Sequence, residues 1–205
     1  MIGVTKIVLF VEAPFGERNY NRYGIEILQK NGFDVEVWDF TPFLRPDVHQ
    51  QVKVLDPVNF AGYKQFLTQR EALVAISGLQ RSCFVLCLIA YRYGTVAIYR
   101  ALSAAPVSYG VVVLSALPAA RALERPVSAL VSVLAKIRHS SRARLWKSLL
   151  SRIPFRLVGI RPATAVLAGG EGYVRYNRVY PMNRKITVLW AHTRDYDVYL
   201  NEKDK

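Results

Sequence analysis

The chain has 205 residues, of which 52% are hydrophobic and 21% charged, so it can bury a core and is not intrinsically disordered. Its formal net charge of +13 favours polyanionic surroundings such as nucleic acid, anionic lipid or phosphorylated ligands. The two cysteines, Cys83 and Cys87, share one apolar run. They form neither a disulfide framework nor a metal-ligand pattern, and a reducing, intracellular setting is expected.

Strands and helices are predicted to alternate along the chain. The expected strands are 6–12, 33–40, 82–90, 107–117, 164–170 and 185–192, and the expected helices are 22–32, 63–79, 93–105 and 123–138. Continuous apolar runs such as KIVLFVE are typical of parallel strands that are buried on both faces. The alternation predicts one α/β domain over residues 1–205, with an open, mostly parallel, Rossmann-like sheet and helices on both faces.

Residues 101–120 carry no charge and are long enough to cross a bilayer as a helix. Pro106, Gly110 and Pro118 interrupt this segment, and alanines and serines dilute its hydrophobicity. These features favour the end of a helix followed by a buried strand over a transmembrane helix.

The basic excess is concentrated in one region, because 125–170 contains nine Lys or Arg and no Asp or Glu. A basic helical segment is predicted over residues 123–162. Within it, 142–153 is predicted to form an amphipathic helix with Leu and Trp side chains in one arc and cations in the opposite arc. The residues expected to contact an anionic membrane surface are Arg142, Arg144, Trp146, Lys147 and Arg152. A helix packed on the core of the domain and a nucleic-acid contact are the alternatives.

Ligands of open parallel sheets bind beyond the carboxyl ends of the strands, near the point where strand order reverses. Four segments are expected there: 12–22, 39–47, 115–118 and 192–197. The first lacks both the G-x-G-x-x-G pattern and the P-loop pattern, so no NAD or FAD is expected. No His/Cys cluster has metal-ligand spacing, so no metal is expected either.

Two of these segments carry chemistry that allows more than one interpretation. The polar loop with Glu17 and Arg18 suits contact with a sugar or a phosphate, or is a solvated loop that caps the next helix. In the last segment, His192 lies close in sequence to Asp195 and Asp197 and suits a general base. The same residues also suit the N-terminus of a helix, where an acidic side chain is favourable.

Residues 6–40, KIVLFVEAPFGERNYNRYGIEILQKNGFDVEVWDF, resemble the opening β-α-β unit of GT-B type glycosyltransferases. In that family a first strand is followed by a helix that ends in Asn-Gly or a similar pair. A second strand then begins with a G-aromatic-D/E-V-x-V pattern, which is 32–37 here. With WDFTPFL and HTRDYDVYL included, the sequence is similar to glycosyltransferase-like proteins of bacterial capsule or O-antigen biosynthesis.

The resemblance implies the N-terminal, acceptor-binding half of such an enzyme, cytoplasmic and peripheral to the inner face of the cell membrane. A lipid-linked or other glycan acceptor would contact Phe15, Gly16, Arg18, Asn19, Arg22 and Arg194. His192 or Asp195 would be the catalytic base, with Glu17 in reserve. No cofactor is implied except a nucleotide-sugar donor, which would bind to a second domain or to a separate polypeptide.

Two other functions remain open for this sequence. One is a non-catalytic interaction or scaffold protein with the same fold. The other is a nucleic-acid-binding protein, which the net charge allows but which no recognised DNA- or RNA-binding signature accompanies.

Overall fold

The computed structural model describes residues 3–51, 56, 58–113, 155–168 and 187–190. The strands are β1 (Lys6–Val11), β2 (Asp34–Asp39), β3 (Tyr63–Gln65), β4 (Cys83–Cys87), β5 (Ser108–Val113), β6 (Ala165–Ala168) and β7 (Thr187–Trp190). The α-helices are α1 (Glu17–Arg22), α2 (Ile25–Lys30), α3 (Thr41–Leu44), α4 (Pro46–Gln51), α5 (Gln69–Ser77) and α6 (Val96–Ala104). Two short 3₁₀ helices are η1 (Tyr93–Thr95) and η2 (Phe155–Val158).

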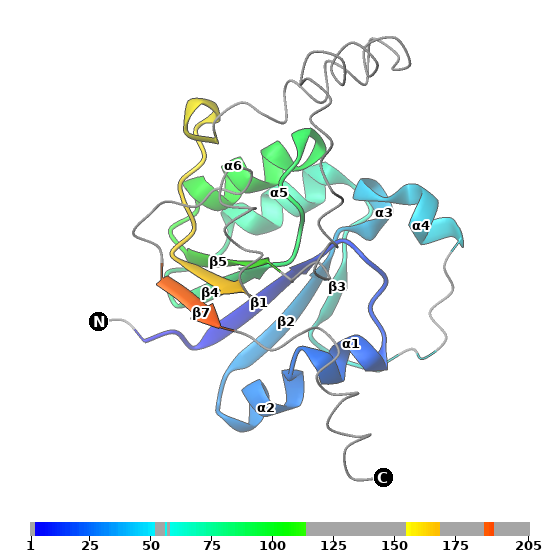
Figure 1. Ribbon diagram of the computed structural model, residues 1–205. Helices are drawn as coiled ribbons and strands as arrows, with labels where there is room; N and C mark the ends of the chain where they lie inside the picture. Colours follow the sequence, from blue (N-terminus) through cyan, green and yellow to red (C-terminus); the bar gives the residue numbers. More distant parts are fainter. Residues whose placement is uncertain (1–2, 52–55, 57, 114–154, 169–186, 191–205) are drawn as a thin grey trace, which may run out of the picture.

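The strands form one open sheet in the order β3-β2-β1-β4-β5-β6-β7 (Figure 1). Every neighbouring pair is parallel. The first six strands have the order of a Rossmann sheet. The predicted open, parallel α/β fold is therefore confirmed.

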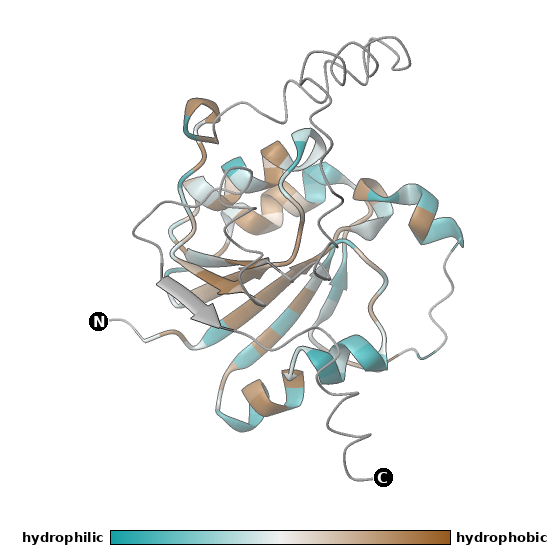
Figure 2. Cartoon of the chain, viewed as in Figure 1, coloured by the Kyte–Doolittle hydropathy of each residue, from teal (hydrophilic) through white to brown (hydrophobic). Residues whose placement is uncertain are grey.

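Helices cover both faces of the sheet, with α1 and α2 on one side and α5 and α6 on the other (Figure 1). Side chains alternate along β1, so that Leu9 and Val11 pack with α2 while Val8 and Phe10 pack with α5 and α6. All four are buried, and the central strands are accordingly the most hydrophobic elements in Figure 2. Burial on both faces explains why β1 is a continuous apolar run.

The helix predicted over 63–79 is wrong at its beginning. Residues 63–65 form the edge strand β3, and α5 begins only after Thr68. The Thr68 hydroxyl accepts a hydrogen bond from the backbone N–H of Glu71 and so caps α5. The preceding residues are drawn into the sheet because Tyr63 and Gln65 both donate to Asp39 at the end of β2.

The loops expected after the first two strands contain helices. The loop after β1 includes α1, and the helix predicted over 22–32 begins at Ile25 as α2. Gly24 separates the two with a φ of 63°, in the left-handed region that favours glycine. The segment 39–47 after β2 contains α3 and the beginning of α4.

The uncharged segment behaves as predicted in its described part, because α6 ends at Ala104 and β5 occupies 108–113. Among the described residues, no helix has the length and apolar character that spanning a membrane requires. The predicted amphipathic helix 142–153 lies outside the described residues. From the basic segment 123–162, the structure describes 155–162, which begins with η2.

Candidate ligand site at the carboxyl edge of the sheet

The strand order reverses between β1 and β4. From β1 the chain goes outward to β2 and β3, and it then returns to the other side of β1 to form β4. The helices that follow β1 and β4 lie on opposite faces of the sheet (Figure 1), and open α/β sheets bind ligands beyond the carboxyl ends of the strands at such a reversal. The segments 12–16 and 88–95 border this position.

A charged pair joins these two segments. The carboxylate of Glu12 accepts a hydrogen bond through Oε1 from the backbone N–H of Ala90, 2.9 Å, and from Nη1 of Arg92, 3.3 Å. Its Oε2 lies 2.6 Å from Nη2 of Arg92. The Glu12 side chain is 13% exposed and that of Arg92 is 37% exposed. The two-pronged contact fixes the guanidinium plane, and the N–H groups of Arg92 that do not face Glu12 keep donor capacity for a ligand.

Thr95 holds the backbone around Arg92. Its hydroxyl is buried, lies 2.8 Å from the carbonyl of Ala90 and accepts a hydrogen bond from the backbone N–H of Arg92, 3.0 Å. The turn that follows β4 therefore has its own polar core, which precedes α6. Arg92 is positioned by this turn as well as by Glu12.

Phe15, a predicted substrate contact, lies in the interior of the domain. Its ring stacks on Tyr63 with 5.7 Å between ring centroids and on Tyr23 with 6.5 Å. Gly16 is also buried and is the N-cap of α1. Both residues anchor the beginning of α1 against the sheet, and so they position the predicted side chains that follow.

Asp56 accepts hydrogen bonds from the first two backbone amides of α1. The backbone N–H of Glu17 donates to the carbonyl of Asp56, 2.8 Å, and that of Arg18 donates to its carboxylate, 3.1 Å. The carbonyl and the carboxylate of Asp56 thus each satisfy one amide of the kind that would face a phosphate in a dinucleotide fold. The Glu17 and Arg18 side chains are exposed.

The other two predicted contacts in α1 form local hydrogen bonds. Asn19 donates through Nδ2 to the carbonyl of Pro14, 3.0 Å, and its Oδ1 accepts from Nη1 of Arg22, 3.4 Å. Both side chains are partly buried. They tie the end of the loop after β1 to α1.

Asp39 ends β2, where a dinucleotide fold carries its ribose-binding acid, but this carboxylate serves the chain itself. It accepts from the backbone N–H of Thr41, 2.8 Å, from the Thr41 hydroxyl, from Tyr63, 2.6 Å, and from Gln65, 3.1 Å. Burial, and then the hydrogen bond to Asp39, raise the pKa of the Tyr63 hydroxyl. The role of Asp39 is therefore to hold β3 at the edge of the sheet.

The described residues offer neither an activated thiol nor a metal centre. Both cysteines are buried, and burial raises the pKa of the Cys87 thiol to about 11, which keeps it protonated at neutral pH. Within the ranges that the structure describes, no group of three or more His, Cys, Asp or Glu side chains could hold a metal ion.

Of the four predicted segments, the structure places the beginning of the first, 12–16, beside the switch point, and 39–47 forms α3 and the beginning of α4 after β2. His192, Arg194 and Asp195 lie outside the described residues, as does 115–118. Arg92 was missed by the sequence reasoning. A signal was present, because Glu12 and Arg92 are the first charged residues after the apolar runs of the first and third predicted strands, and carboxyl ends of parallel strands meet at the same sheet edge.

No protein-family model, curated protein or solved structure matches the chain. The fold and the site define a Rossmann-like α/β domain with a Glu–Arg pair at its topological switch point.

Proposed function

We propose that this chain is the acceptor-binding half of a glycosyltransferase of bacterial surface-polysaccharide biosynthesis, peripheral at the inner face of the cell membrane. The observation that supports it best is the Glu12–Arg92 pair at the switch point. A sugar hydroxyl can donate to a carboxylate and accept from a guanidinium at once, so a rigid pair of this kind suits a glycan acceptor.

In the proposed reaction an acceptor hydroxyl loses its proton to a base while its oxygen attacks the anomeric carbon of the donor sugar. The bond from that carbon to the nucleotide breaks, and the nucleotide leaves with the electron pair. His192 or Asp195 is the proposed base and Glu17 the reserve. The donor is held by a second domain or a separate polypeptide, and Glu12 and Arg92 orient the acceptor.

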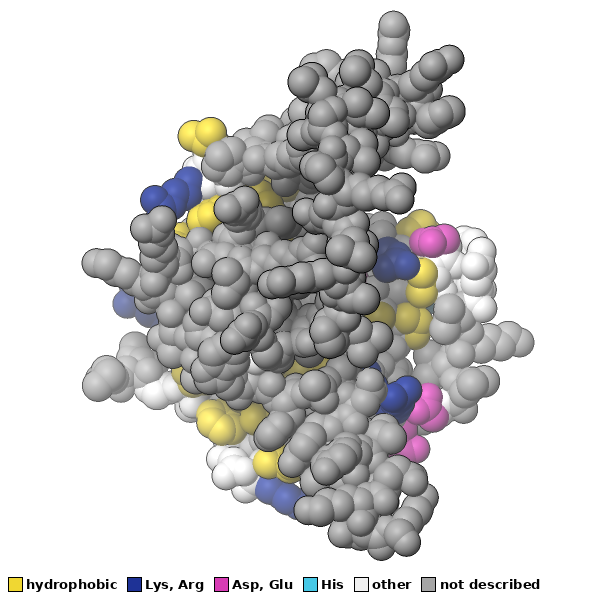
Figure 3. All heavy atoms as spheres, in the orientation of Figure 1, with side chains coloured by type: hydrophobic (Ala, Val, Ile, Leu, Met, Phe, Trp, Pro, Cys, Tyr) yellow, Lys and Arg dark blue, Asp and Glu magenta, His cyan; other side chains and the backbone are white. Residues whose placement is uncertain are grey.

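The proposed membrane contact is the basic helix with Trp146, which lies outside the described residues. In the view of Figure 3 the described Lys and Arg side chains are scattered and do not form one basic patch. Co-sedimentation with anionic phosphatidylglycerol vesicles tests this contact. We expect binding to fall with Trp146→Ala and with Arg144→Glu, and a wild-type chain that ignores these vesicles contradicts it.

Acceptor binding is tested with polyprenyl-linked saccharides extracted from bacterial membranes, measured by microscale thermophoresis in detergent. Arg92→Met removes the guanidinium but keeps an unbranched apolar side chain, and we expect at least tenfold weaker binding. Arg100→Met removes an exposed arginine from α6 and is the matched control, with binding unchanged. Equal effects of the two substitutions contradict a specific role for the switch point.

Transfer is tested separately by following radiolabelled sugar from UDP-, GDP- and dTDP-sugars into the same lipid extract. We expect incorporation only when a donor-binding polypeptide is added, and we expect Arg92→Met to reduce it. A chain that binds none of the extracted glycans, with or without a partner, refutes the proposed function.

A further inference from the structure

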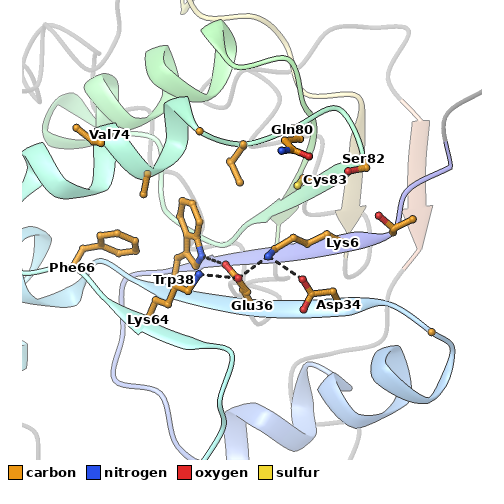
Figure 4. Close-up of a pocket in the computed structure, with 15 residues that line it drawn as sticks. Lys6, Asp34, Glu36, Trp38, Lys64, Phe66, Val74, Gln80, Ser82 and Cys83 are labelled. Carbon is orange, nitrogen blue, oxygen red and sulfur yellow. Dashed lines mark hydrogen bonds and ion pairs between the residues drawn. The ribbon is translucent and has the colours of Figure 1, made fainter.

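A groove of about 800 Å³ lies on the α5 side of the sheet and runs from the amino ends of β1, β2 and β4 to Lys64 and Phe66; neither Glu12 nor Arg92 borders it. It is bordered by the first residues of three adjacent strands, Lys6 of β1, Asp34 of β2 and Cys83 of β4. Figure 4 shows β1 and β2 as its floor and α5 above them. Its volume is in the range of small-molecule sites.

The floor carries four charged side chains of alternating sign. Lys6 Nζ lies 2.9 Å from Asp34 Oδ2 and 2.6 Å from Glu36 Oε1, and Lys64 Nζ lies 2.8 Å from the same Glu36 oxygen (Figure 4). Glu36 Oε2 accepts a hydrogen bond from the indole of Trp38, 2.7 Å. Two cations and two anions leave the floor with no formal net charge, which disfavours ligands with a strong charge of either sign.

The floor still offers both donors and acceptors to a ligand. The half-exposed ammonium of Lys64 contacts only Glu36 among the described residues, so it keeps N–H donors. Asp34 uses only Oδ2 in its contact with Lys6, and its side chain is 64% exposed. Gln80 brings a side-chain amide, which both donates and accepts, to the rim. A ligand that matches this floor needs groups that donate and accept at short spacing.

The wall that faces this polar floor is apolar. It includes Phe66, Val74 and Leu79, and Figure 4 shows Val74 on α5 with Phe66 towards the Lys64 end. Val74 is 66% exposed although it is hydrophobic. An apolar wall opposite a neutral polar floor fits a ligand with one C–H face and one hydroxyl face.

We propose that this groove binds a neutral carbohydrate, a mono- or disaccharide, whose hydroxyl groups contact Asp34 and Lys64 and whose C–H face packs on Phe66 and Val74. The proposal does not depend on the acceptor site at the carboxyl ends of β1 and β4. It assigns the chain a second, separate ligand site.

The test uses ligand-observed saturation-transfer NMR on the whole chain. The probes are the methyl glycosides of glucose, galactose, mannose and N-acetylglucosamine, with maltose and lactose. We expect at least one probe to bind the wild type, about tenfold weaker binding to Lys64→Met, and loss of binding to Gly78→Phe.

Gly78→Phe fills the groove without backbone strain, because a Cβ there meets only the Ala75 carbonyl oxygen at 3.5 Å and that of Val74 at 4.0 Å. Gly94→Phe is the matched control, because a Cβ at Gly94 meets nothing within 4 Å and this residue does not border the groove. Sugar binding should survive in the control. If Gly78→Phe does not fold, the loss of sugar binding is measured with Lys64→Met on the edge strand alone.

Three outcomes overturn the proposal. In the first, none of the sugar probes binds. In the second, sugars bind but Gly78→Phe and Lys64→Met leave that binding intact. In the third, the groove binds decanoate, added as an apolar probe, and none of the sugars. The acceptor proposal is separable, because Arg92→Met should weaken lipid-linked glycan binding while it leaves the binding of the small sugars unchanged.

Discussion

Glu36 is the centre of the charged network on the sheet, and its replacement by glutamine is the most informative stability test. Its side chain is only 11% exposed and interacts with Lys6, Lys64 and Trp38. Glutamine has the same shape but only one oxygen, so its amide faces either the ammonium groups or the indole N–H, donor against donor.

The magnitude follows from these contacts. A hydrogen bond to a charged group contributes about 1.5–3 kcal/mol, and a half-exposed ion pair contributes about 0–1 kcal/mol. The bond to Lys6 belongs to the first kind and that to Lys64 to the second, since the Lys64 side chain is 51% exposed. We expect Glu36→Gln to lower the free energy of unfolding by about 2–3 kcal/mol at pH 7, a loss of roughly 5–10 °C in Tm.

The pH dependence of the stability loss tests whether the effect comes from the charge of Glu36. Burial alone would raise the pKa of the Glu36 carboxyl, but hydrogen bonds from Lys6, Lys64 and Trp38 outweigh it and lower the pKa. The stabilisation is therefore present above about pH 4.3, the value for an unfolded glutamate, and is lost as the pH falls through the native pKa.

Lys6 sets the upper pH limit of this stabilisation. Burial lowers its pKa, but the hydrogen bonds to Glu36 and Asp34 outweigh burial and raise it. This contribution is present below about pH 10.4 and is lost as the pH rises through the native pKa. The difference between wild type and Glu36→Gln should be widest between about pH 5 and 10 and shrink on both sides.

Urea unfolding followed by circular dichroism, repeated across pH, measures this difference. Glu26→Gln is the matched control, because Glu26 forms an exposed i,i+4 pair with Lys30 at 2.7 Å and its loss should leave stability unchanged within error. A Glu36→Gln deficit that is the same at pH 3 and pH 7 would refute the electrostatic explanation.

Three further predictions concern the core. Tyr63→Phe removes one donor from buried Asp39 and should cost about 1–2 kcal/mol in urea unfolding, and a loss below about 0.5 kcal/mol would show that the bond is unimportant. Burial raises the pKa of the Cys87 thiol to about 11, so this thiol should resist Ellman's reagent in the native chain and react on unfolding. Rapid labelling of the native chain would contradict the burial. Gly62→Ala places a Cβ 2.3 Å from a β2 carbonyl oxygen and should destabilise by about 2–4 kcal/mol, while Gly94→Ala, with nothing within 4 Å, should leave the unfolding midpoint nearly unchanged.

Asp39 matches the sequence pattern of a ribose-binding acid, but in this structure its carboxylate is used to hold the fold together. An acid at the end of the second strand is where a Rossmann fold contacts ribose. The structure surrounds this acid with donors from Thr41, Tyr63 and Gln65. Thr41 is a local donor, two residues along the chain, whereas Tyr63 and Gln65 lie 24 and 26 residues away and reach Asp39 only because β3 packs beside β2.

The sequence by itself determined the parallel sheet and the positions of β1, β2, β4, β5, β6 and β7, and it marked the loop after β1 as one that could border a ligand site. These are local signals, because a strand buried on both faces must be a continuous apolar run and a helix must repeat its apolar face every three or four residues. Only the tertiary structure decided that 63–65 is an edge strand, that Glu12 meets Arg92 and that Lys6, Glu36 and Lys64 form the floor of a groove. Each of these depends on side chains that lie about 30 to 80 residues apart, which strand order and register bring together and which no local pattern encodes.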